Sequence, residues 1–475
     1  MNNSNFKILF VASEVESLAK TGGLADVAKA LPLALKEQGF DVRIVMPFYK
    51  SINRREQAKS IASYQSHTIG FGISELKIAD VPVYLVEHDD YFLRDELYTE
   101  NGHGFADNGE RFSFFSQAVF PLCETLDFKP DIIHCNDWHT GLVPFLLEKQ
   151  YRGSEFFKDT RSVITIHNAA YQGIFPGQQF AKLESQLNID ELYEDHHAVN
   201  MLKTGIRFAN KINAVSPSYA AELLTHLGSH GLSDILNERA DDLSGILNGC
   251  DYSDWDPQTD PYLPSNYSQS DMSGKTVCRQ SLQIKVGLEQ NDVAIFGVVA
   301  RLTEQKGFHM LIEALEDFLI HDVQVIIVGT GDPKLASQLH QLSQQYPQKL
   351  AFIEAYSNEL AHLIEAGSDF FLMPSVFEPC GLNQMYSLAY ATLPIVRAVG
   401  GLKDTVIDYD QNPEQATGFV FEQPSGQTLL NSLRRALLLY LEHPDAIQDM
   451  CDRAIQTRFL WQDSLPQYTE LYKQA

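Results

Sequence analysis

Short apolar runs that alternate with amphipathic stretches indicate an α/β protein. An almost wholly apolar run covers 6–12, and two further runs cover 41–46 and 81–87. Strands that are apolar throughout are typical of parallel sheets, because both faces of such a sheet are covered. Beyond the first run, apolar positions from Leu24 to Leu35 follow a helical spacing. We therefore expect strand, loop and helix in that order near the N-terminus.

The same alternation begins again in the second half of the chain. An apolar run at 293–300 is followed by a polar loop at 301–307 and a helical pattern from Phe308, and the next run covers 324–328. Alternating strands and helices on this scale predict a doubly wound sheet with right-handed crossovers. Because 475 residues exceed what one core supports, we expect two such sheets in separate domains.

The stretch 370–391 predicts a functional carboxylate. The apolar run 370–373 is ended by Pro374, and a helical spacing resumes at Leu382, so that Glu378 lies between a strand end and a helix start. Open α/β sheets bind ligands in the crevice beyond the carboxyl ends of their strands. We expect Glu378 to face a ligand there; the alternative is a carboxylate that accepts the free N–H groups of the helix start.

A glycine-bearing loop follows the first predicted strand. It leads through Lys20 into Gly22 and Gly23 and then into the predicted helix. Glycines let the backbone approach an anion at a helix N-terminus, and a lysine adds a point charge, so the loop could bind phosphate. The spacing is not that of a dinucleotide fingerprint, which gives no support to nicotinamide binding. The alternative is a tight turn with a solvated lysine.

Two short predicted strands end in polar clusters that contain His134, Asp137, His139 and His167. A metal site is one interpretation, but none of the familiar zinc-ligand spacings is present. The other is a polar floor that binds sugar hydroxyl groups. A purely structural role for the histidines is a third.

Three strings, in this order along the chain, resemble the bacterial glycogen synthases and plant starch synthases. They are Lys20-Thr-Gly-Gly-Leu, Arg301-Leu-Thr-Glu-Gln-Lys-Gly and Glu378-Pro-Cys-Gly-Leu, and the resemblance extends over nearly the whole chain. It implies the GT-B architecture, in which two Rossmann-like doubly wound domains face a central cleft. It also implies a retaining glucosyltransferase that moves glucose from ADP-glucose to the non-reducing end of an α-1,4-glucan such as glycogen.

The domain boundaries follow from composition and from this resemblance. Residues 252–275 are rich in Asp, Ser, Pro and Tyr with weak periodicity, which is typical of a crossing between domains. In related transferases the last helix returns to the first domain. We therefore expect an N-terminal domain at 1–250, completed by 457–475, and a nucleotide-sugar-binding domain at 251–456.

The resemblance also implies roles for matching residues. The catalytic candidates are Glu378, His167, Arg301, Lys306 and Asp137. The candidates for binding the donor are Lys20, Gly22, Gly23, Tyr98, Asn248, Arg301, Lys306, Cys380, Gly381, Leu382, Gly400, Gly401 and Thr405. The chain departs from the commoner family string at Asn136, where a histidine is usual.

In such a transfer, positive charge develops at the anomeric carbon and negative charge on the departing diphosphate. The site must therefore hold a group of opposite charge beside each of them. Arg301 and Lys306, which belong to one predicted loop, suit the departing diphosphate, since preorganised cations commonly supply the largest catalytic term. We expect no metal ion and no other cofactor. Double displacement needs a second carboxylate about 5 Å from the first. Related transferases often carry one where this chain has Tyr386, which favours a front-face substitution in which the leaving phosphate takes the acceptor's proton.

Composition excludes several classes of function. The 62 acidic and 36 basic residues give a formal charge of −26, which repels nucleic acid and anionic lipid but not a neutral glucan. Six scattered cysteines form no Cys-x-x-Cys pair, so a disulfide framework or zinc knuckle is not indicated. No apolar run has the length of a signal-peptide core or a membrane span. We expect a soluble cytoplasmic protein; the oligomeric state stays open.

Two other functions remain open. One is a related GT-B transferase that uses UDP-glucose or a small acceptor, because these motifs do not specify the nucleotide. The other is a catalytically silent glucan-binding scaffold, which is disfavoured because Lys20, His167, Arg301, Lys306 and Glu378 are all present.

Overall fold

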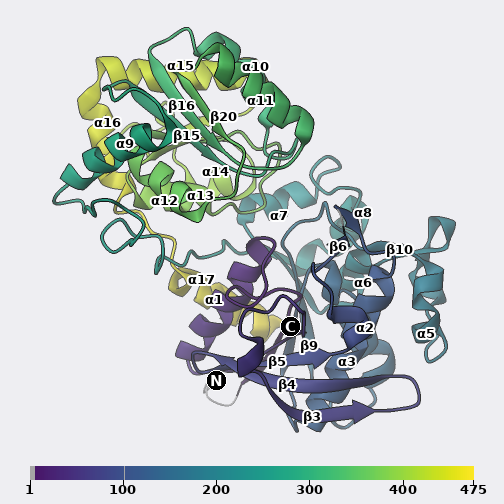
Figure 1. Cartoon of the computed structure of the whole chain (residues 1–475). Coiled ribbons are helices and arrows are strands. Elements are labelled where there is room, and N and C mark those ends of the chain that lie inside the picture. Colours follow the sequence, from purple (N-terminus) through teal and green to yellow (C-terminus); the bar gives the residue numbers. More distant parts are fainter. Residues whose placement is uncertain (1–5, 101) are drawn as a thin grey trace. The chain divides into compact units, whose positions relative to one another are not determined.

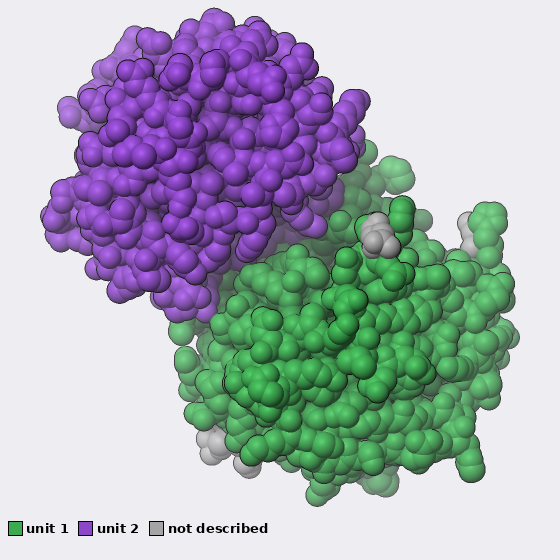
Figure 2. Space-filling model, viewed as in Figure 1, with its two compact units in different colours: residues 1–249, 461–475 green, residues 250–460 purple. Residues whose placement is uncertain are grey.

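The computed structural model describes residues 6–100 and 102–475, and the chain forms two compact units (Figures 1 and 2). Unit 1 comprises 1–249 and 461–475, and unit 2 comprises 250–460. The domain boundaries predicted from the sequence fell after 250 and after 456, whereas the structure assigns Cys250 and 457–460 to unit 2. Residues 457–460 belong to unit 2 because Cys250 N donates to Phe459 O (2.7 Å) and Phe459 N donates to the hydroxyl of Tyr252 (3.1 Å).

Unit 1 is built on a nine-stranded sheet in the order β14-β13-β9-β8-β1-β2-β5-β4-β3. Its strands are β1 (Lys7–Val11), β2 (Asp41–Pro47), β3 (Lys59–Gln65), β4 (Gly70–Ile78), β5 (Val81–Glu87), β8 (Ile132–Asn136), β9 (Arg161–Ile166), β13 (Lys211–Ala214) and β14 (Leu243–Gly245). All pairs from β14 to β5 are parallel, as predicted, whereas β4 and β3 extend the sheet antiparallel. The sequence analysis missed this hairpin because β3 is largely exposed and forms no apolar run.

Helices and two small sheets complete unit 1 (Figure 1). The helices are α1 (Gly23–Glu37), α2 (Asp89–Phe92), α3 (Asn108–Thr125), α4 (Leu142–Leu146), α5 (Ala181–Glu184), α6 (Met201–Phe208), α7 (Pro217–Leu223), α8 (Ser233–Glu238) and α17 (Trp461–Gln474). One small sheet contains β10 (Ile174–Pro176), β12 (Ala198–Asn200) and β11 (Tyr193–Glu194), and the other contains β6 (Thr99–Glu100) and β7 (His103–Gly104). Ser216 caps α7 by accepting from Tyr219 N, with Pro217 in the first turn.

Unit 2 contains a six-stranded sheet in the order β17-β16-β15-β18-β19-β20, with every pair parallel. Its strands are β15 (Ala294–Val299), β16 (Val323–Val328), β17 (Leu350–Ile353), β18 (Phe370–Met373), β19 (Leu393–Arg397) and β20 (Phe419–Phe421). Its helices are α9 (Ser273–Val286), α10 (Phe308–Phe318), α11 (Pro333–Gln345), α12 (Asn358–Gly367), α13 (Asn383–Ala389), α14 (Gly400–Thr405), α15 (Gly426–Glu442) and α16 (Pro444–Ala454). The strand order reverses between β15 and β18, which makes this the topological switch point of a Rossmann-like sheet.

The core of unit 2 lies on both faces of its sheet. Neighbouring residues of β15 alternate between two buried clusters, with Phe296 in one and Ile295 in the other, and both side chains are fully buried. The apolar character of both faces is what the sequence pattern predicted. Polar groups near the centre of this sheet are therefore found beyond the strand ends.

Residues 252–275, expected to cross between domains, lie within unit 2. The ring of Trp255 is stacked on His362 (3.7 Å between centroids) and on Tyr386 (4.3 Å). Asp260 is almost completely buried and is hydrogen-bonded to His362 Nδ1 (2.8 Å) and to the hydroxyl of Tyr390 (2.5 Å). Tyr386 thus packs against this segment.

Helix α17 packs in unit 1 through polar as well as apolar contacts. The hydroxyl of Tyr472 is hydrogen-bonded to His134 Nδ1 (2.8 Å), and Asn213 Nδ2 donates to the hydroxyl of Tyr468 (3.3 Å). Ser464 donates to Leu247 O (2.6 Å). His134 is completely buried, so its ring nitrogens depend on these partners.

The variant Tyr472→Phe should lower the free energy of unfolding by about 1–3 kcal/mol, because it leaves a nitrogen of the buried His134 without a partner. Urea unfolding followed by fluorescence measures this. Tyr171→Phe is the matched control in the same unit, since Tyr171 is 56% exposed. Equal midpoints for the two variants would show that the His134 contact adds no stability.

Candidate active site

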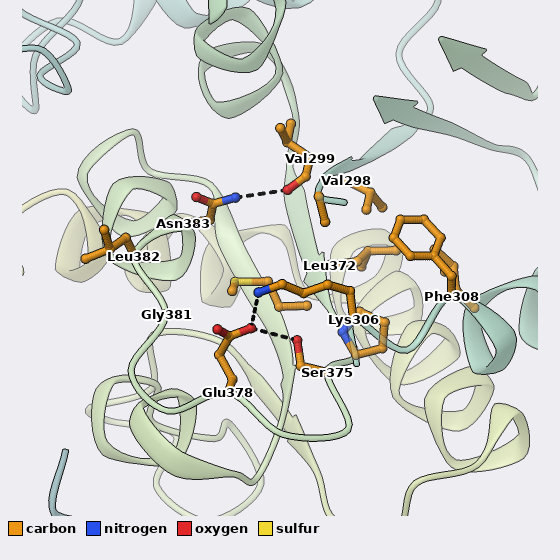
Figure 3. Close-up of a pocket in the computed structure, with 14 residues that line it drawn as sticks. Val298, Val299, Lys306, Phe308, Leu372, Ser375, Glu378, Gly381, Leu382 and Asn383 are labelled. Atoms are coloured by element: carbon orange, nitrogen blue, oxygen red, sulfur yellow. Dashed lines mark hydrogen bonds and ion pairs between the residues drawn. The ribbon is translucent and has the colours of Figure 1, made fainter. Parts of the chain in front are cut away.

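The predicted carboxylate and one predicted cation meet at the switch point of unit 2 (Figure 3). Lys306 Nζ donates to Glu378 Oε2 (2.5 Å), and Ser375 Oγ donates to the same oxygen (3.0 Å). The side chain of Glu378 is only 8% exposed and that of Lys306 22%. A buried ion pair of this kind keeps a full negative and a full positive charge side by side in a weakly screening environment.

Both charged groups line a cavity of about 130 Å³ at the ends of β15 and β18. Its lining residues are Val298, Val299, Ala300, Lys306, Phe308, Leu311, Leu372, Met373, Pro374, Ser375, Glu378, Gly381, Leu382 and Asn383. The Lys306 loop is fixed against the Glu378 loop: Val376 N donates to Gln305 O (2.8 Å), and a Cβ at Gly307 would lie 1.9 Å from Pro374 O. Gly307 also has a φ of +74°, so glycine suits this position on two grounds.

The alternative role of Glu378 as a helix cap does not match its contacts. Helix α13 begins at Asn383, and its N-cap residue, Leu382, makes no side-chain cap. The Glu378 carboxylate instead contacts Lys306 and Ser375. Glu378 therefore faces the cavity.

Arg301, the other predicted cation, is placed differently. It is exposed, it is not among the residues that line the cavity, and it has no ion-pair or hydrogen-bond partner among the residues that the structure describes. Arg301 and Lys306 share one loop but not one environment. Contact of both side chains with a single diphosphate stays a prediction.

The remaining predicted donor contacts of unit 2 have separate positions. Gly381 and Leu382 line the cavity, whereas Cys380 and Thr405 are buried, and Thr405 Oγ1 donates to Gly401 O (2.6 Å). Gly400 and Gly401 pack against the Glu378 loop: an added Cβ would lie 2.0 Å from Glu378 O at Gly400 and 2.1 Å from Cys380 O at Gly401. This glycine pair lets two backbones approach closely.

The glycine pair of unit 1 has the opposite environment. A Cβ added at Gly22 or Gly23 would meet no atom within 4 Å, so space beside this loop is open. Lys20 is exposed and pairs with Asp26 (2.6 Å), a carboxyl whose pKa is raised by burial. The N-terminus of α1 is thus accessible, as binding of an anion requires.

Glu14, which the sequence analysis did not identify, holds this loop. One of its carboxylate oxygens accepts from Thr21 N (2.5 Å) and Gly22 N (3.2 Å), and the other accepts from Thr21 Oγ1 (2.6 Å) and the hydroxyl of Tyr98 (2.8 Å). The hydroxyl of Tyr98, a predicted donor contact, is also hydrogen-bonded to the hydroxyl of Ser13 (2.8 Å between the oxygens). Glu14 lies in no motif, so its spacing gave no signal.

Asp137 and His167 meet at the ends of β8 and β9. Asp137 Oδ1 accepts from the backbone N–H groups of His167 (2.7 Å) and Asn168 (3.4 Å). Burial raises the pKa of Asp137 to about 7, against the lowering effect of these two donors. Asp137 also has a φ of +55°, an uncommon conformation outside glycine that places its carboxylate over the next strand end.

Asn136 orients the predicted histidine. Its Nδ2 donates to Val11 O (3.0 Å), so its Oδ1 is the acceptor for His167 Nε2 (2.9 Å). This assigns the proton of His167 to Nε2 and leaves Nδ1 as an acceptor. Burial lowers the pKa of His167 to about 3, so the ring is neutral near pH 7.

The other histidines of the two clusters differ from His167. His134 is a structural residue, bonded to Tyr472 and Thr165. The ring of His139 is stacked on Trp138 (3.9 Å between centroids) and tilted against Tyr98 (4.6 Å), and its Nδ1 has no partner among the described residues. Across the described part of the chain, no three His, Cys, Asp or Glu side chains are grouped so as to hold a metal ion. That the protein needs no metal ion stays a prediction.

Asn248 is a buried residue whose side-chain oxygen has no hydrogen-bond partner among the described residues. A buried, unpaired carbonyl oxygen costs free energy unless a ligand or water satisfies it. Its position therefore agrees with the predicted contact to a polar ligand.

Comparison with known proteins identifies the family. The family model "Starch synthase catalytic domain" matches 7–238, and "Glycosyl transferases group 1" matches 280–453. A glycogen synthase of Aeromonas salmonicida is 56% identical over 99% of this chain and 98% of its own. A glycogen synthase of Photobacterium profundum is 54% identical over 98% and 94%. The chain belongs to the glycogen synthase family.

A solved structure supports the same conclusion for the fold. The catalytic domain of starch synthase IV from Arabidopsis thaliana, bound to ADP and acarbose, is 31% identical, with a TM-score of 0.89 and coverage of 99% of both chains. The resemblance to the glycogen and starch synthases and the expectation of two Rossmann-like domains are thereby confirmed. Within the described residues, no helix is both long and apolar enough to span a bilayer.

The pKa of Asp137 generates a prediction about stability. A carboxyl group whose pKa is higher in the folded than in the unfolded state binds more protons when folded, here between ~pH 4 and about pH 7. The stability that this group contributes is therefore present at low pH and lost as pH rises through that window. Relative to Asp137→Asn, the wild type should lose up to ~1.4 kcal/mol per pH unit.

Urea unfolding of both proteins from pH 4 to pH 8 measures this difference. A difference that stays constant, or that grows in favour of the wild type as pH rises, would show that the two backbone donors outweigh burial and keep Asp137 ionised.

Proposed function

We propose that the chain is a glycogen synthase that transfers glucose from ADP-glucose to the non-reducing end of an α-1,4-glucan with retention of configuration. The observation that carries this proposal is the buried Lys306–Glu378 pair at the switch point of unit 2. The names of the relatives and the ADP bound to the starch synthase IV structure support the donor and the acceptor.

The pair suits the charges that such a transfer develops. Positive charge grows at the anomeric carbon and negative charge on the departing diphosphate. Lys306 then serves the diphosphate and Glu378 the sugar, because both charges are already placed at one site before substrate binds, and Lys306 exchanges its bond to Glu378 for one to the diphosphate. Ser375 keeps Glu378 oriented when Lys306 changes partner.

Retention through a front-face substitution is the mechanism that this chain favours. Tyr386 occupies the position where related transferases often have a second glutamate, and its ring is stacked on Trp255. The leaving phosphate then takes the proton of the acceptor hydroxyl. We assign His167 a positioning role, because its neutral ring offers Nδ1 as an acceptor to a sugar hydroxyl while Nε2 is bound to Asn136.

A cytoplasmic location agrees with the cysteines. All six are free, and all but Cys451 are buried, as expected for a protein of a reducing compartment. We propose no metal ion or further cofactor, no nucleic-acid partner and no membrane partner. A preference for UDP-glucose or a small acceptor, and a silent glucan-binding scaffold, are the outcomes that the following assay separates.

Purified protein incubated with glycogen should incorporate label from radioactive ADP-glucose much faster than from UDP-glucose. The new linkages should be released by an α-1,4-specific glucosidase. Equal incorporation from both donors would contradict the nucleotide preference. No incorporation from either, with glycogen still bound, would favour the scaffold.

Arg301→Ala and Lys306→Ala should each lower kcat by ~10²–10³, the scale seen when one preorganised charge-stabilising group is removed. Because both act on one developing charge, the double variant should lose less than the product of the single losses. Wild-type activity should survive EDTA. Lys334→Ala, which removes an exposed lysine of the same unit, is the control and should keep its kcat.

Thermal midpoints separate catalysis from stability in this series. Lys306→Ala should also lower the midpoint, since it leaves the buried Glu378 without its cation, whereas the exposed Arg301 should not. A normal kcat in either folded variant, or loss of wild-type activity in EDTA, would contradict the proposed roles.

A further inference from the structure

The glycine loop of unit 1 is held by a carboxylate with an unusually complete set of donors. Glu14 is 3% exposed, and its two oxygens together accept four hydrogen bonds from Thr21, Gly22 and Tyr98. The two backbone donors precede the first residue of α1, Gly23. Glu14 therefore binds the loop immediately outside the helix and not the helix itself.

This arrangement divides the N–H groups at the N-terminus of α1 into two sets. Those of Thr21 and Gly22 are bound to Glu14, whereas those of Gly23 and Leu24 have no acceptor among the residues that the structure describes. The first N–H groups of a helix have no partner inside it and favour an anion. The space beside Gly22 and Gly23 is also open, with no atom within 4 Å of an added Cβ.

We propose that Glu14 is a positioning residue for the sugar-nucleotide donor: it fixes the glycine loop in the conformation that leaves Gly23 N and Leu24 N available to the donor's diphosphate. This inference rests on the proposed function, because it takes a diphosphate as the anion. Both oxygens of Glu14 are already bonded to the loop and to Tyr98, so Glu14 acts through the loop.

A second set of contacts ties the same carboxylate to the polar floor of unit 1. Tyr98 donates to Glu14, and its ring contacts His139 (4.6 Å), which is stacked on Trp138 (3.9 Å). Displacing the loop would break the bond to Tyr98, and displacing Tyr98 would free an oxygen of Glu14. Glu14 thus couples the position of the loop to the position of Tyr98.

The requirement is for a carboxylate and not only for a polar side chain. A glutamine has the same shape but one acceptor oxygen, and its NH₂ group would face either the Thr21 and Gly22 N–H groups or the two hydroxyls. An NH₂ group that faced the two N–H groups could not bond them. An NH₂ group that faced the two hydroxyls could donate to them, but the remaining amide oxygen would hold the two N–H groups by neutral bonds, roughly half as strong as bonds to a carboxylate, so the loop is held less firmly in Glu14→Gln. The same substitution removes a negative charge near the expected diphosphate, which by itself would strengthen anion binding.

These two effects have opposite signs, and a titration with ADP decides between them. If Glu14 positions the loop, Glu14→Gln should weaken ADP binding about 10-fold, the loss expected for one or two hydrogen bonds to a charged group. The KM for the donor should rise in parallel while kcat at saturation changes less than twofold. Thr21→Val, which removes one of the four donors and leaves both backbone N–H groups, should weaken ADP binding by a smaller factor.

Glu16→Gln is the matched control, because Glu16 lies in the same loop and binds Lys29 and not the glycine-loop amides. It removes an equal charge and should leave ADP binding within about twofold. Calorimetry on the whole protein gives the affinities. Hydrogen exchange at Thr21 and Gly22, which should be faster in Glu14→Gln, shows whether the loop moved even where the affinity change is small.

Unchanged or tighter ADP binding by folded Glu14→Gln would overturn the inference. So would a rise in KM equally large in Glu16→Gln, since that result would indicate charge alone. Failure of the proposed function gives a different result: the wild type itself would bind no ADP and transfer no glucose.

Discussion

A parallel sheet that is covered on both faces leaves polar side chains one place near its centre, the edge where the strands end. In unit 2 this constraint places Lys306 and Glu378 beyond β15 and β18, where the strand order reverses. In unit 1 it places Asp137 and His167 beyond β8 and β9, which are neighbours in the larger sheet. The site residues of each unit therefore come mainly from the turns that follow the strands, and Asn136, the last residue of β8, is the polar contribution of a strand itself.

Carboxylates do the positioning at these edges, and each is held by a different kind of donor. Glu378 is bound by an ammonium and a hydroxyl, Asp137 by two backbone N–H groups, and Glu14 by backbone N–H groups and two hydroxyls. Burial by itself favours the neutral form of a carboxyl group. For Asp137 burial prevails and raises the pKa, because two backbone donors are its only compensation. The number and charge of the donors thus decide which carboxylates can serve as fixed negative charges.

Hydrophobic periodicity and short motifs predicted part of the fold and part of the site. The apolar runs located most parallel strands of both sheets, and the motifs located Glu378 and Lys306, because each lies at a strand-to-helix junction that the pattern itself reveals. The hairpin of β3 and β4 was missed because β3 is a largely exposed edge strand and the apolar residues of β4 are separated by glycine and polar residues, so that neither strand forms an apolar run. Residues 95–110 also form no apolar run, yet they contain β6, β7 and the start of α3.

Contacts between residues far apart in the sequence could not be predicted. Glu14 meets Tyr98 across 84 positions, and Trp255 is stacked on Tyr386, which lies far from it in the sequence. The two glycine pairs, Gly22-Gly23 and Gly400-Gly401, show the same limit. Their strings are alike, yet one pair faces open space and the other is packed against backbone. Only the fold distinguishes a glycine that admits a ligand from one that admits a neighbouring loop.

The candidate anion-binding cations of the two units differ in whether they are already paired with a carboxylate. Lys20 is paired with Asp26 and Lys306 with Glu378, whereas Arg301 has no partner among the described residues. An anion that binds Lys306 must therefore take it from a carboxylate that is already desolvated, so the gain is a difference between two ion pairs and not a new attraction. Arg301 gives up only water.

The need to exchange partners weakens the binding of anions in general. The net charge of −26 repels anions at long range, and Lys306, the buried cation of the site, is already paired with Glu378. A ligand that binds tightly must therefore interact with both members of the pair. A sugar nucleotide can do so, because its phosphate groups can pair with Lys306 and its sugar hydroxyl groups can donate to Glu378.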